Sequence, residues 1–132
     1  MCNSLHQKGK LKLGSFDAKR QGIYLTMPAG PTPGKVIDLL SDLLNGMIPV
    51  GYRPKDLKSD ELELPSPLSG ALLASLEGAS GLIKMYVIQN RGIDSQMIQT
   101  DVLKKDGVAW VFLNAYELDG NERALCILGV NK

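Results

Sequence analysis

The sequence predicts an α+β domain: an antiparallel sheet of about five to six strands with two helices on one face. Three observations lead to this fold class. Several short segments are alternately or continuously apolar, as strands are. Two segments begin with a capping residue followed by proline, as helices do. Turn residues separate the apolar segments of the C-terminal half. The expected order is β-β-α-α-β-β-β-β within a single domain over residues 1–132.

The first two strands are expected to be short. Residues 10–16 alternate, with Leu11 and Leu13 on one face and lysines on the other, which is typical of a half-exposed strand. Residues 22–27 form a second apolar segment, which ends where prolines and glycines follow.

The first helix is expected to begin after Thr32, a suitable N-cap, with Pro33 at its first position, and to end before Gly46. Its apolar residues recur at helical spacing on one face: Val36, Leu39, Leu40, Leu43 and Met47. Residues 49–65, which are rich in proline and charge, then indicate a surface loop.

Ser66 followed by Pro67 repeats the same starting pattern and predicts a second helix that runs to about Glu77. Small residues recur at every fourth position along this segment: Gly70, Ala74 and Gly78. A helix with such a smooth side can lie close against a sheet.

Four further strands are expected over residues 82–89, 96–104, 108–116 and 123–130, because turn residues separate these apolar segments. Residues 96–103 are the most polar and are therefore the expected edge strand.

The last two strands are apolar on both faces, so both faces of the sheet must be covered. In residues 108–116, alternation puts Val108, Trp110, Phe112 and Tyr116 on one face and Ala109, Val111, Leu113 and Ala115 on the other. Two short helices cover only one face, and the smaller set suits close helix packing. We therefore expect Trp110, Phe112 and Tyr116 to face a partner subunit or a ligand.

Composition favours a cytoplasmic protein. The two cysteines, Cys2 and Cys126, lie at opposite ends of the chain and are expected to be free thiols, as in a reducing compartment. No segment is long or apolar enough to span a membrane, and the N-terminus lacks the pattern of a signal peptide.

No catalytic motif is recognisable, so no catalytic residue, metal ion or cofactor is expected. His6 is the only histidine, and it lies in a terminal segment that would hold catalytic geometry poorly. The sequence contains no cysteine and histidine spacing typical of zinc sites and no calcium-loop pattern of acidic residues.

The N-terminal segment 1–20 is basic and carries Lys8, Lys10, Lys12, Lys19 and Arg20. Such a stripe can bind nucleic acid or an anionic membrane surface. Lysines are also common on edge strands, where they prevent association between sheets, and this second interpretation is the more usual one.

Residues 104–130 resemble the last two strands of PAS sensory domains. Asp106-Gly107 forms the turn before a strand that contains Trp110, and the final strand ends in Gly129-Val130. This resemblance implies a small-ligand pocket or a dimerising sheet without catalysis of its own.

The sequence thus favours a non-enzymatic binding or assembly module whose sheet forms an oligomer interface or a small-ligand pocket. The expected partner is a second copy of the chain or another protein. The alternative is a nucleic-acid or anionic-surface binding protein that uses the basic N-terminal strand.

Overall fold

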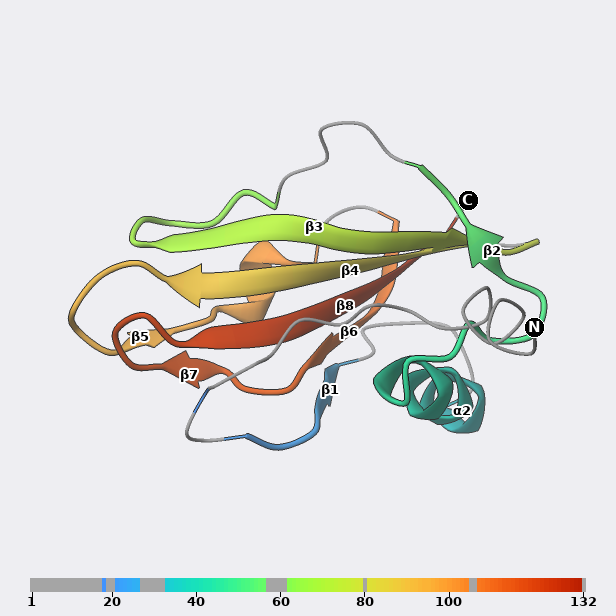
Figure 1. Ribbon diagram of the computed structural model, residues 1–132, viewed down its shortest axis with the longest axis horizontal. Coiled ribbons are helices and arrows are strands. Elements are labelled where there is room, and N and C mark those ends of the chain that lie inside the picture. The colour runs from blue at the N-terminus through green and yellow to red at the C-terminus, as the bar shows by residue number, and fades with distance from the viewer. Residues whose placement is uncertain are drawn as a thin grey trace, which may run out of the picture.

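The computed structural model describes residues 18, 21–26, 33–56, 62–79, 81–104 and 107–131, and Figure 1 shows their arrangement. The elements in chain order are β1 (Tyr24–Thr26), α2 (Pro33–Leu44), β2 (Arg53–Pro54), β3 (Leu68–Glu77), β4 (Gly81–Asn90), β5 (Gln96–Met97), the 3-10 helix η1 (Thr100–Val102), β6 (Val108–Leu113), β7 (Glu117–Leu118) and β8 (Arg123–Asn131). No helix among these residues is both long and apolar enough to cross a bilayer.

Six strands form one antiparallel sheet in the order β1-β6-β8-β4-β3-β2, and β5 pairs with β7 in a separate two-stranded sheet. The long strands β3, β4 and β8 lie side by side, and α2 lies over one face near β1 (Figure 1). Among the described strands, β1 and β2 are therefore the two edges of the main sheet.

The expectation of two helices is wrong, because the segment predicted as the second helix is strand β3. It pairs with β4 from Leu68 to Glu77 with a β-bulge between Leu72 and Ala74. The bulge moves the buried side chains from one face to the other. As a result, Leu68, Leu72, Leu73 and Leu76 show helical spacing although they belong to a strand.

The small residues from which a smooth helix was expected instead allow other segments to pack closely against strand β3. A Cβ on Gly70 would lie 2.8 Å from the Cβ of Leu62, and a Cβ on Gly78 would lie 2.6 Å from the Tyr52 ring. Residues 62 and 52 both come from the segment 49–65 that was expected to be a surface loop. That segment is partly paired, since β2 pairs with β3 and Leu62 bridges to Gly70.

Two other strand expectations need correction. Within residues 96–104 only Gln96–Met97 is a strand; it pairs with β7 and is not an edge of the main sheet, and η1 follows it. The expected strand 108–116 ends at Leu113, and residues 117–118 form β7.

The first expected helix is confirmed as α2, and strand 22–27 is confirmed as the shorter β1. The expected strand 10–16 lies outside the described residues.

Both faces of β8 are buried, as its sequence predicts. Leu125 and Ile127 belong to the cluster under α2, together with Val36, Leu40, Leu43, Leu76, Ile83, Met85, Ala109, Trp110 and Phe112. Cys126 and Leu128 belong to the cluster on the opposite face, which includes Ile98, Leu103 and Leu118, with Leu62 and Leu64 packed against it. The chain itself therefore covers both faces.

The expectation that the smaller side chains pack under the helices holds for Ala109 and is wrong for Val111, Leu113 and Ala115. β6 has a bulge between Val108 and Trp110, so Val108 pairs with Val130 while Trp110 pairs with Gly129. The bulge puts Ala109 on the same face as Trp110 and Phe112, and this is the face that α2 covers. Val111 and Leu113 face the opposite cluster.

Candidate binding groove between β1 and α2

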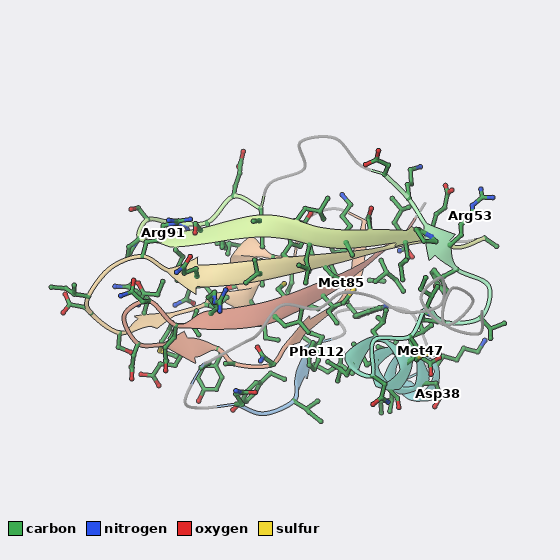
Figure 2. All side chains as sticks on the ribbon, in the orientation of Figure 1. Asp38, Met47, Arg53, Met85, Arg91 and Phe112 are labelled. Carbon is green, nitrogen blue, oxygen red and sulfur yellow. The ribbon has the colours of Figure 1, made fainter. Side chains whose placement is uncertain are left out.

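An apolar groove of about 510 Å³ lies between the edge strand β1 and helix α2. Its walls are Ile23 and Leu25 on one side and residues of α2 and its C-terminal end on the other, namely Ile37, Leu40, Ser41, Leu44 and Asn45. Phe112 of β6 also lines it and lies beside α2 in Figure 2. A volume of this size is typical of sites that bind ligands or partner side chains.

Helix α2 forms its wall because its apolar face is wider than the core requires. Val36, Leu40 and Leu43 are buried against the sheet. Ile37 and Leu44 lie beside this buried row and remain 56% and 40% exposed. The groove is therefore the outward continuation of the core packing of α2.

The end of α2 is held by a Schellman motif, which fixes the position of the last groove residues. Gly46 has φ of +76°. The Gly46 N–H donates to the carbonyl of Leu43 at 3.0 Å, and the Met47 N–H donates to the carbonyl of Asp42 at 2.8 Å. The Asn45 side-chain amide donates to the Ser41 carbonyl at 2.8 Å.

Strand β1 forms the other wall. Leu25 is the register partner of Phe112, so the two side chains lie next to each other on the face that α2 covers. Ile23 precedes β1 on the same face and is 76% exposed. Among the described residues, no strand pairs with the outer side of β1.

The charged residues of α2 lie outside the groove. Lys35, Asp38 and Asp42 are all exposed, and the two aspartates are one helical turn apart. Asp38 points away from the centre of the sheet, where Met85 is labelled (Figure 2). By helical spacing, the two aspartates form the row next to Ser41 and Asn45, which we call the acidic rim of the groove, and Lys35 lies on the same side of the helix one turn before Asp38.

The three aromatic residues that the sequence singled out have different surroundings. Trp110 and Phe112 are buried under α2, and only Phe112 lines the groove. Tyr116 is exposed and makes an edge-to-face contact with Tyr24, with ring centroids 4.7 Å apart. A role of these residues in an interface stays a prediction.

The basic residues Lys8, Lys10, Lys12, Lys19 and Arg20 lie outside the described residues, so their proposed binding also stays a prediction.

No family model and no curated protein matches this chain. The resemblance of residues 104–130 to PAS domains therefore stays a prediction.

Two observations bear on metal binding and thiol chemistry. Among the described residues, no group of three or more histidine, cysteine or acidic side chains is placed so that it could hold a metal ion. Burial raises the pKa of the Cys126 thiol to about 12, so the thiol stays protonated at neutral pH. Because the thiolate is the reactive form, Cys126 is an inert core residue.

Sequence reasoning missed Ile23, Ile37 and Leu44, which line the groove. The available signal was the apolar arc of α2, in which residues 36, 37, 40, 43, 44 and 47 cover more than the stripe that a sheet-covering helix needs.

Proposed function

We propose that the protein is a non-enzymatic binding module that holds aliphatic side chains of a partner protein in the groove between β1 and α2. The observation that carries the proposal is the convergence of three partly or largely exposed aliphatic side chains, Ile23, Ile37 and Leu44, on one apolar groove. Scattered exposed aliphatic residues are normal, but exposed residues that join one hollow surface favour an interaction site.

The chemistry of the lining favours protein side chains over a small polar ligand. Ser41 and Asn45 are its polar members among the described residues, and both lie on the exposed side of α2. Small-molecule sites usually add a few buried polar groups that orient the ligand. Here the gain comes from burying aliphatic surface, about 1 kcal/mol for each half-exposed isoleucine or leucine.

The same lining supports binding without catalysis. It contains no carboxylate, imidazole or thiol among the described residues. General acid–base and nucleophilic catalysis need such groups within hydrogen-bonding reach of the substrate.

A selection from a displayed library of random dodecapeptides tests this proposal with the full-length chain. Peptides that bind the protein are counter-screened against Ile37→Asp, which puts a charge into the groove at a position whose side chain is 56% exposed. We expect aliphatic peptides whose affinity falls at least tenfold in Ile37→Asp. They should perturb the methyl NMR signals of Ile23, Leu25 and Leu44.

Ile93→Asp is the matched control. Ile93 is exposed in the loop that follows β4, at the end of the long strands that lies away from α2. It should leave peptide affinity unchanged. A library that yields no peptide sensitive to Ile37→Asp would overturn the proposal. So would a dimer, detected by light scattering, that Ile37→Asp dissociates, because the groove would then belong to a second copy.

A further inference from the structure

We infer that the partner enters the groove as an extended segment that adds a strand to the main sheet along β1. This inference rests on the proposed function, because it assumes that the groove between β1 and α2 is the binding surface. It specifies the chemistry of the partner: a β-strand with aliphatic side chains at alternate positions and a basic residue beside them.

The two edges of the main sheet differ in a way that favours β1 as the acceptor. The edge strand β2 consists of Arg53 and Pro54, and Lys55 follows it. Proline has no N–H to donate, and charged side chains discourage a further strand, so this edge is protected. Arg53 and Lys55 also pair with Glu77 of the neighbouring strand, at 3.1 and 3.3 Å.

Strand β1 carries none of these protective features. Its residues are Tyr24, Leu25 and Thr26, which are uncharged and of types common in strands. In an antiparallel edge strand, alternate residues direct their N–H and C=O groups away from the neighbouring strand, and no described strand pairs with this side of β1. These groups can pair with the backbone of an incoming segment.

Strand addition at β1 also accounts for the position of the groove. Successive side chains of a new strand would point to opposite faces, so every second side chain would lie on the face that α2 covers. Those side chains would enter the groove between Leu25 and the α2 residues Ile37 and Leu44. A partner segment with aliphatic residues at positions i and i+2 fits this spacing.

Charge complementarity specifies the flanking residue of the partner. Asp38 and Asp42 are exposed on α2 and form the acidic rim beside Ser41 and Asn45. Lys35 is the third exposed charged residue of α2 and lies one turn nearer its N-terminus. A lysine or arginine next to the aliphatic residues would therefore lie in a favourable field.

Backbone N-methylation of one selected peptide tests strand addition without changing the protein. Two derivatives of this peptide each carry two N-methyl groups on alternate amides. One derivative is methylated in the first alternating set of amides, and the other is methylated in the second set; each set is called a frame. Both keep the same side chains and the same mass. We expect one frame to weaken binding about tenfold, because N-methylation removes the peptide N–H groups that donate to β1, and the other to bind as the parent peptide does.

An exchange of charges tests the inferred basic residue of the partner. The double variant Asp38→Lys, Asp42→Lys should weaken binding of a peptide with a flanking lysine about two- to fivefold and strengthen binding of its glutamate counterpart. Equal affinity of both N-methyl frames, with binding still sensitive to Ile37→Asp, would overturn strand addition and leave the proposed function standing. Peptides insensitive to Ile37→Asp would overturn both.

Discussion

The indole of Trp110 lies against the backbone of Gly129, its register partner on β8. A Cβ on Gly129 would come within 2.1 Å of the indole Nε1. The ring therefore occupies the space that any other residue at 129 would need for its side chain. This contact lets Trp110 lie under α2 although β8 is its direct neighbour in the sheet.

Gly129→Ala is expected to destabilise the protein by about 1–3 kcal/mol, since the methyl group would displace the indole from its packed position. Urea unfolding followed by tryptophan fluorescence measures this, because Trp110 is the only tryptophan. Gly34→Ala is the control: a Cβ at Gly34 has no neighbour within 4 Å, so stability should change little. Equal effects of the two substitutions would contradict the assigned contact.

Asn90→Ala is expected to cost about 2–4 kcal/mol, because Asn90 is fully buried and holds three backbone groups. Its amide nitrogen donates to the carbonyls of Asp94 (2.7 Å) and Leu118 (3.0 Å), and its side-chain oxygen accepts from the Gly92 N–H (2.9 Å). Thermal and chemical unfolding report the change. Asp94→Ala keeps the backbone carbonyl and should stay within about 0.5 kcal/mol of the parent protein.

Gly46→Ala is expected to cost about 1 kcal/mol, because alanine is strained at the φ of +76° that ends α2. Loosening this end also displaces Leu44 and Asn45, so peptide affinity for the groove should fall together with stability. Hydrogen exchange of the Gly46 and Met47 amides locates the effect. Unchanged protection of these amides would argue against the Schellman motif.

Cys126 should react with a thiol reagent only after unfolding. A Cys2→Ser background leaves it as the sole thiol, so the native protein should be unreactive at pH 8 and fully reactive in denaturant. Rapid labelling of the native protein would contradict its burial.

The raised pKa of Cys126 also predicts a pH dependence of stability. The folded-state pKa of about 12 lies above the ordinary value of 9.0, so only the unfolded chain releases the proton between these values. Its contribution to stability is therefore complete below about pH 9 and decreases as pH rises towards 12. Cys126→Ala should show a smaller loss of stability between pH 9 and 11 than the parent protein.

Sequence patterns predicted the elements whose signals are local. The caps and the apolar spacing that predict α2 come from residues 32–46. The burial of both faces of β8 is indicated by the apolar residues at both alternating sets of positions in that strand. Strand β3 was missed because its bulge breaks the two-residue period, and the bulge is visible only through the register with β4.

The groove was largely beyond sequence reasoning for a similar reason. Its walls come from β1 and α2, but Phe112 enters through the pairing of β1 with β6, nearly ninety residues along the chain. The bulge before Trp110 also decides which side chains of β6 face α2. Neither the long-range pairing nor the bulge leaves a periodic pattern in the sequence.

The place of β8 in the sheet has a consequence for how the two halves of the sheet depend on each other. The last strand lies between β4 and β6, so it joins the β2-β3-β4 half of the sheet to β6 and β1. Without Arg123–Asn131, no other described strand would connect the two halves, and Phe112 would lack its neighbour Ile127 on β8. A single strand therefore couples the groove wall formed by β1 to the long strands β3 and β4, so a substitution that loosens β8 would affect both halves of the sheet.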